Sequence, residues 1–195
     1  MMVFHMKRLI VILCLIFFAV SGYSQVKFEK EERIKRAEAP ADAISFVDSM
    51  NLNNKVKWYR ETGYSTISFE AKTKHKGKRI SVEFSENGTF EDIEIEIRTD
   101  EISCNAFSKV SDYLLASHEK YKIDKIQIQY SGEPNTVLNY FLTNEVAGDL
   151  VINYEVVINT KEDGAFARFE YLFDKDGEFI QKRRIKLSMT DNIEF

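Results

Sequence analysis

The stretch Gly77–Ile97, GKRISVEFSENGTFEDIEIEI, indicates the fold class of this chain. Its apolar residues alternate with polar ones in two runs, Ile80, Val82 and Phe84, then Ile93, Ile95 and Ile97. A period of two is typical of strands that bury one face. Asn87-Gly88 between the runs favours a tight turn, so we expect the two strands to form an antiparallel hairpin.

The residues before this hairpin predict two more strands and a helix. Alternating apolar residues mark strands around 56–58 and 67–71, and short polar links separate the successive runs. Short links join neighbouring strands, so we expect an antiparallel meander. Pro40 suits the first turn of a helix. The apolar residues that follow it at helical spacing are Ala43, Ile44, Val47 and Met50.

The same order of elements restarts at Ser103. A longer helix that runs to Tyr121, capped by Ser103 or Asn105, precedes strand-like runs around 126–130, 152–158, 169–173 and 185–187. The turn FSENGTF at 84–90 has a counterpart 89 positions later, FDKDGEF at 173–179.

This internal match predicts a duplicated architecture. We expect an α+β fold of two tandem units, residues 25–102 and 103–195, each a helix packed on a four-stranded antiparallel sheet. The second unit carries an insertion at 131–150, in which 134–144 favours a short helix.

This order of elements resembles the PepSY-like group of secreted bacterial proteins, whose fold is similar to that of the beta-lactamase inhibitory protein. The resemblance rests on KVKWYR at 55–60, SFEAKTK at 68–74, GKRISVEF at 77–84 and NGTFEDIEIEI at 87–97. It implies a binding or inhibitory role in the bacterial envelope. It brings no catalytic residues with it, and the contact loops of that inhibitor are not matched.

The N-terminus predicts export. Lys7 and Arg8 precede twelve apolar residues, Leu9–Val20, and small residues follow at Ser21–Ser24. As a helix this run spans about 18 Å, short of the roughly 30 Å that crosses a bilayer. We therefore expect residues 1–24 to be a signal peptide cleaved after Ser24, a periplasmic or secreted location, and no transmembrane segment in the mature chain.

Composition and motifs exclude several functional classes. The chain has 195 residues, 27 of them basic and 31 acidic, and its net charge of −4 disfavours nucleic-acid binding. The histidines and cysteines lack metal-ligand spacing, so His75 and His118 are interpreted as surface residues and Cys104 as a small buried residue at a helix start. We predict no catalytic residue, no metal site and no cofactor.

The strand residues out of phase with the apolar set form the opposite face of the sheet. We expect this face to be solvated and to be the candidate docking surface for a protein partner in the envelope. Tyr59 is the predicted anchor, whereas Trp58 shares the apolar phase and is assigned to the core. The predicted partner-binding residues are Lys57, Tyr59, Glu70, Glu83, Glu94, Gln127, Gln129 and Arg168.

The sequence favours a non-enzymatic secreted or periplasmic binding module that inhibits or regulates an envelope protein. One alternative is a hydrolase of an envelope polymer. Its carboxylates would come from Glu70, Glu83, Glu94 and Glu96. Another is a structural component of a surface or secretion complex. The lysine-rich hairpin 72–79 either contacts an anionic partner or protects a sheet edge. Neither the partner nor the oligomeric state follows from the sequence.

Overall fold

The computed structural model describes residues 25–27, 30–146 and 148–186. Its helices are α2 (Ala41–Ser49), α3 (Cys104–Ser117), α4 (Pro134–Thr143) and the 3-10 turns η1 (Arg36–Glu38) and η2 (Thr99–Glu101). The strands of the first half are β1 (Gln25–Lys27), β2 (Lys30–Ile34), β3 (Lys57–Thr62), β4 (Ile67–His75), β5 (Lys78–Ser85) and β6 (Phe90–Glu96). Those of the second half are β7 (Tyr121–Gly132), β8 (Leu150–Glu162), β9 (Ala165–Asp174) and β10 (Phe179–Ile185).

These strands form one continuous sheet, so the prediction of two separate four-stranded units is wrong. The strand order is β1-β10-β9-β8-β7-β6-β5-β4-β3-β2, antiparallel from β2 to β10, with β1 parallel to β10. Across the predicted boundary, β6 pairs with β7 from Asp92↔Ser131 to Glu96↔Gln127. Two four-stranded sheets would each leave unpaired backbone groups at this position, and pairing the two edges satisfies those groups.

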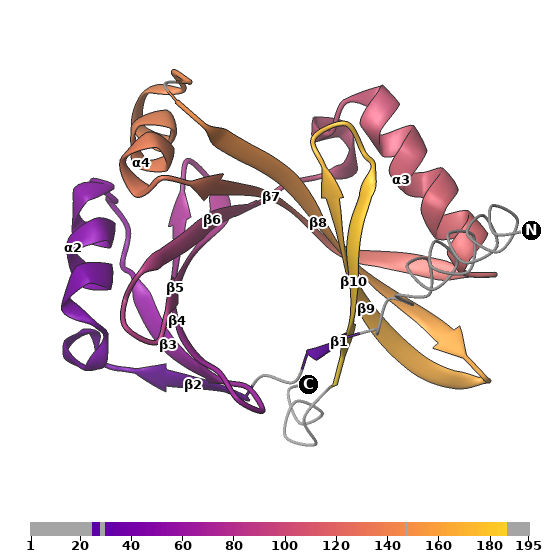
Figure 1. Cartoon of the computed structure of the whole chain (residues 1–195), viewed down its shortest axis with the longest axis horizontal. Coiled ribbons are helices and arrows are strands. Elements are labelled where there is room, and N and C mark those ends of the chain that lie inside the picture. The colour runs from indigo at the N-terminus through magenta and orange to yellow at the C-terminus, as the bar shows by residue number, and fades with distance from the viewer. Residues whose placement is uncertain (1–24, 28–29, 147, 187–195) are drawn as a thin grey trace, which may run out of the picture.

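The sheet is strongly curled, and the described helices α2, α3 and α4 lie on its convex side (Figure 1). Apolar side chains on that side form two clusters. The first packs beneath α2 and contains Trp58. This residue is only 2% exposed, which confirms its assignment to the core. The second packs beneath α3 and contains Tyr171 and Phe173.

Helix α4 belongs to the first cluster although it lies in the second half of the chain. The helix predicted within 134–144 is confirmed, and its Val137 is fully buried among first-cluster residues. The Glu133 side chain accepts a hydrogen bond from the Thr136 N–H at 2.9 Å and caps the helix. The segment predicted as an insertion in one unit thus completes the core of the other.

The N-terminal strands bring the two edges of the sheet close together. β1 stands at one end of the strand order and β2 at the other, although they are consecutive in the chain. Near these edges Lys186 Nζ donates to Tyr64 Oη at 3.0 Å. The concave side is therefore enclosed by the curl rather than lying open as a flat face (Figure 1).

The two turns matched in the sequence have the same local structure. Gly88 and Gly177 have φ of +85° and +82°, and their N–H groups donate to Ser85 O and Asp174 O at 2.9 and 3.0 Å. A register shift follows each turn, one opposite Glu83/Phe84 and one within Phe179/Gln181. The internal duplication stays a prediction, and these turns are its strongest structural correspondence.

Several element predictions need correction. The charged segment before Pro40 contains strand β2, and Tyr121 begins β7 instead of extending α3. Ser103 caps α3 as predicted, accepting from the Ala106 N–H at 3.2 Å. Cys104, however, is exposed, which corrects its assignment as a buried residue.

The sequence pattern puts Ile185 on the helix side of the last strand and Arg184 on the opposite face, and this assignment is wrong. The irregularity after Phe179 shifts the phase of β10, so Arg184 pairs with Phe169 and lies on the helix side, while Ile185 pairs with Arg168 on the concave side. Leu187, predicted to follow in phase, lies outside the described residues.

The predicted signal peptide, residues 1–24, also lies outside the described residues. Among the helices that the structure does describe, none combines the length and the apolar character needed to span a bilayer.

Candidate functional site

The structure places all eight predicted partner-binding residues on the concave side of the sheet. Cross-strand register fixes this arrangement, because Tyr59 pairs with Glu70 and Glu70 with Glu83. In the next row Gln129 pairs with Glu94. Lys57, Tyr59, Glu70 and Gln127 border one cavity, whereas Arg168 lies in the opposite half of the sheet and pairs with Asp124 at 2.6 Å.

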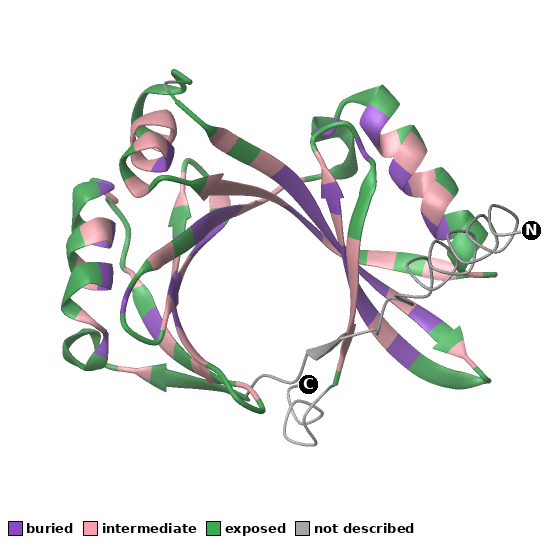
Figure 2. Cartoon of the chain, viewed as in Figure 1, coloured by how far each residue is buried: buried purple, intermediate pink, exposed green. Residues whose placement is uncertain are grey.

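Much of this polar face is buried, which corrects the expectation that it is solvated. Figure 2 shows that buried residues are concentrated along the strands in the middle of the sheet. The buried carboxylates on it are 5 to 8% exposed and comprise Glu70, Asp92, Glu94, Glu155 and Glu170. Alternation predicts correctly that these side chains point away from the helices. It does not predict their burial, which arises because the curl of the sheet crowds the side chains on its inner side.

Side-chain amides donate hydrogen bonds to carboxylates in the middle of the concave face. Gln127 Nε2 donates to Glu94 Oε2 at 2.7 Å, and Gln129 Nε2 donates to Asp92 Oδ2 at 3.0 Å. Asn153 Nδ2 then donates to Gln129 Oε1 at 3.2 Å, which extends the network to β8. Three predicted partner-binding residues, Glu70, Glu94 and Gln127, are thus buried and engaged within the sheet.

Lys72 is the central cation of the first half. Its Nζ lies 2.8 Å from Glu70 Oε2 and 2.9 Å from Glu31 Oε2, and its ammonium sits 5.0 Å from the centre of the Tyr59 ring. Burial opposes the charged form of Lys72, but Glu70 and Glu31 outweigh it and raise its pKa above the ordinary value.

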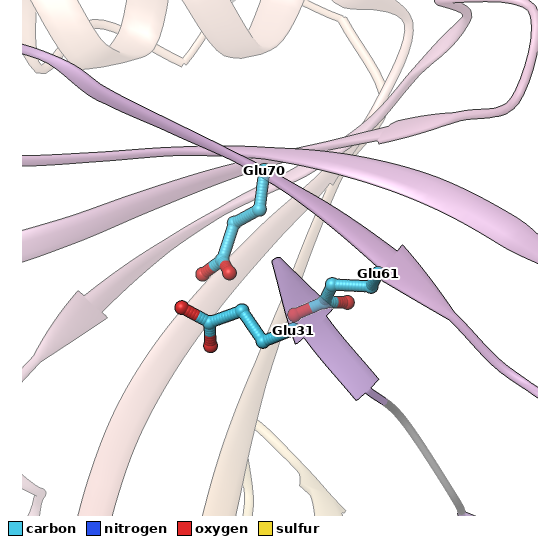
Figure 3. A group of neighbouring side chains, drawn as sticks. All are labelled: Glu31, Glu61 and Glu70. Carbon is cyan, nitrogen blue, oxygen red and sulfur yellow. The ribbon is translucent and has the colours of Figure 1, made fainter. Parts of the chain in front are cut away.

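Two groups of carboxylates come close enough to suggest cation binding. Glu31, Glu61 and Glu70 have ligand atoms within 4.8 Å of one another (Figure 3). The Lys72 ammonium already neutralises two members of this group. The second group is Glu83, Asp92 and Glu94, two of which accept the amide hydrogen bonds described above. Sequence spacing could not predict either group, because each one is assembled across strands.

A cavity of about 510 Å³ opens on the concave side near the start of β3 and the β4–β5 hairpin. Its floor includes the buried residues Ser81 and Gln127, and the Ser81 hydroxyl donates to Glu70. The loop before β3 forms one wall and is held in place, since Asn54 Nδ2 donates to Lys74 O at 2.6 Å. The basic residues that line it are Lys55, Lys57, Lys72, Lys74, Arg79 and Lys125.

The sequence prediction missed the contribution of the lysine-rich hairpin to this site. β4 and β5 are interior strands, so Lys72, Lys74 and Arg79 do not protect a sheet edge. The sequence does contain a pattern that predicts this placement. Lys72 and Lys74 continue the alternation that begins at Glu70, so they belong to the same face of the strand. Lys125 likewise continues the alternation of Gln127 and Gln129, because the register shift of β7 lies before it, between Ile123 and Lys125.

The comparisons with known proteins found similarity only among solved structures. No protein-family model and no curated protein matches the chain. A DUF2874 family protein from Bacteroides uniformis has a TM-score of 0.49 at 14% identity, covering 75% of this chain and 89% of its own. A DUF2874 family protein from Bacteroides ovatus has a TM-score of 0.48 at 11% identity, with the same coverage. A BLIP-like protein from Bacteroides fragilis has a TM-score of 0.45 at 13% identity, covering 77% of this chain and 89% of its own.

Proposed function

We propose that this chain is a non-enzymatic binding protein of the bacterial envelope that inhibits or regulates a protein partner, which docks on the concave side of the sheet. One observation carries the proposal. The α-helices that the structure describes cover the convex side, while the concave side keeps a cavity of about 510 Å³, lined mostly by polar and charged residues, beside a half-buried tyrosine, Tyr59. A cavity of this size with a few fixed polar groups is typical of recognition sites.

The extracytoplasmic location in this proposal comes from the predicted signal peptide. The non-enzymatic role is supported by the state of the carboxylates named for the hydrolase alternative. Glu70 binds Lys72 and Ser81, Glu94 accepts from Gln127, and Glu96 pairs with Arg79 at 3.3 Å. A glycosidase uses two carboxyl groups that face each other across a substrate cleft, one as an acid. These three of the four carboxylates instead form contacts between neighbouring strands.

Site-specific photo-crosslinking tests the docking face. A photoreactive amino acid at Lys57, on the rim of the cavity, should form a covalent adduct with one protein of the envelope. The same group at Leu115, which is 62% exposed on α3, is the control and should not form that adduct. An adduct at Leu115 but not at Lys57 would place the docking surface on the convex side and overturn the proposal.

Two neighbouring aromatic residues separate binding from folding. Tyr59→Ala should weaken partner binding by about 1 to 2 kcal/mol, since an aromatic anchor contributes on this scale. Trp58→Ala should instead lower the free energy of unfolding by about 3 to 5 kcal/mol, because it empties a core position. Titration calorimetry with the partner that the crosslinking identifies measures the loss of binding, and urea unfolding measures the loss of stability. The opposite pattern would invert the face assignment.

A further inference from the structure

We infer that the cavity beneath the β4–β5 hairpin binds an acidic segment of the partner protein, a stretch of chain rich in aspartate or glutamate. This inference rests on the proposed function, since it names the chemistry of the partner at the same site. It is argued from the charge of the cavity lining, the hydrogen bonds of its floor and the fixed shape of its wall.

The lining is strongly basic within an acidic protein. Six basic side chains and two carboxylates border the cavity, while the whole chain carries a net charge of −4. Positive charge gathered in a concave site with poorly polarisable walls concentrates the field and attracts anions. The site therefore attracts negatively charged ligands even though the chain as a whole is negatively charged.

Three of the six basic side chains already form ion pairs with carboxylates of the same chain. Lys72 binds Glu70 and Glu31, Arg79 binds Glu96, and Lys125 Nζ lies 3.7 Å from Glu155 Oε1. The other half consists of Lys55, Lys57 and Lys74. All three are exposed at the mouth and make no ion pair with any residue that the structure describes. They are the charges available to a ligand.

The floor adds a requirement for a hydrogen-bond donor. Gln127 is 6% exposed, and its Nε2 is committed to Glu94, which fixes the orientation of the amide. Its Oε1 is buried and accepts no hydrogen bond from the described part of the chain. A buried acceptor without a donor is costly, and a ligand N–H group would relieve this cost once a small shift of the floor side chains exposed the oxygen.

A peptide carries both features. Aspartate or glutamate side chains meet the lysines at the mouth, and backbone N–H groups supply donors for the floor. The wall needs little rearrangement to receive them, because Thr73 Oγ1 donates to Lys55 O at 3.2 Å and Asn54 to Lys74 O. Such preorganisation lowers the entropic cost of binding.

Fluorescence anisotropy with a labelled octaglutamate peptide tests the inference on the purified protein. Octaglutamate should bind with an affinity that falls as salt rises, and octalysine should not bind. The double variant Lys57→Gln/Lys74→Gln should weaken binding roughly tenfold, because it removes two of the three available charges. The matched control Lys120→Gln/Lys161→Gln makes the same charge change at exposed lysines away from the cavity and should stay within about twofold. Equal weakening by both double variants would overturn the inference.

A polygalacturonate competitor distinguishes peptide from polysaccharide, since it presents carboxylates without amide N–H groups. Displacement of octaglutamate by polygalacturonate at equal carboxylate concentration would assign the site to an anionic polysaccharide and overturn the peptide assignment. The crosslinking at Lys57 keeps the two proposals apart. A protein adduct at Lys57 without octaglutamate binding would overturn this inference alone. Octaglutamate binding without a protein adduct would overturn the proposed function.

Discussion

Gly177 illustrates how one residue position ties a turn to a helix. Its φ of +82° suits glycine, and a Cβ built there would lie 2.4 Å from Ala106 O at the start of α3. Gly88 stands in the same relation to the start of α2, where a Cβ would lie 2.6 Å from Pro40 Cβ. In both halves of the chain, the absence of a side chain lets the turn pack directly against the first turn of the helix.

Gly177→Ala should therefore lower the free energy of unfolding by more than about 2 kcal/mol, from left-handed strain combined with the backbone clash. Gly164→Ala is the matched control. It has a φ of +78° but nothing within 4 Å of the added Cβ, so only the conformational cost of about 1 kcal/mol should remain. Urea denaturation measures both values. Equal losses in the two variants would show that the contact with α3 contributes nothing.

At the scale of elements, the end of α3 meets β9 through His118. The sequence interpretation of His118 as a surface residue is corrected, because the ring is partly buried and its Nε2 lies 2.6 Å from Tyr171 Oη. Burial and the neighbouring charge of Lys182 lower the pKa of His118 below its ordinary value, and Glu162 opposes them. This contact couples the position of α3 on the sheet to the protonation of one imidazole.

The sign of the pH effect follows from that lowered pKa. Above the ordinary histidine pKa, both the folded and the unfolded chain keep this ring neutral. As the pH falls below about 6.5, the unfolded chain takes up a proton more readily than the folded chain, so the free energy of unfolding should decrease. His118→Gln should reduce this decrease between about pH 7.5 and 5.5, above the range in which ordinary carboxylates titrate. Urea unfolding of the unmodified protein and of His118→Gln at several pH values measures it. An unchanged slope in His118→Gln would contradict the assignment.

At the scale of the molecule, the continuous sheet makes the two apolar clusters one mechanical unit. β6 and β7 join the halves through five paired positions, and Val137 from the second half completes the first cluster. We therefore expect the halves to unfold together, in contrast to the independent units that the sequence predicts.

Trp58 reports on this cooperativity, because it is the single tryptophan and lies in the first cluster. Leu114→Ala, fully buried beneath α3 in the second cluster, should destabilise by about 2 to 5 kcal/mol. The Trp58 fluorescence transition in urea should shift by the same free energy as the transition followed by far-UV circular dichroism. A Trp58 transition that stays in place while circular dichroism shows an early loss of structure would restore the two-unit description.

The sequence by itself determined the local elements and the faces of most strands. Alternation placed Trp58 in the core and Tyr59 on the opposite side, and proline and serine marked the starts of α2 and α3 correctly. These features depend on neighbours within a few residues, where periodicity and capping chemistry suffice. Even this local reasoning failed on β10, because one irregularity after Phe179 reverses the phase of the side chains from Gln181 to Ile185.

Only the tertiary structure decided how the halves join, how far the polar face is buried and which charges meet. The pairing of β6 with β7 satisfies two sheet edges that the sequence pattern leaves equally free to face solvent. The curl of the joined sheet then crowds carboxylates such as Glu70 and Glu94 into the interior and gathers lysines from several strands around one cavity. Burial and charge at this site depend on which distant strands pair with one another. A local pattern of neighbouring residues does not specify that pairing.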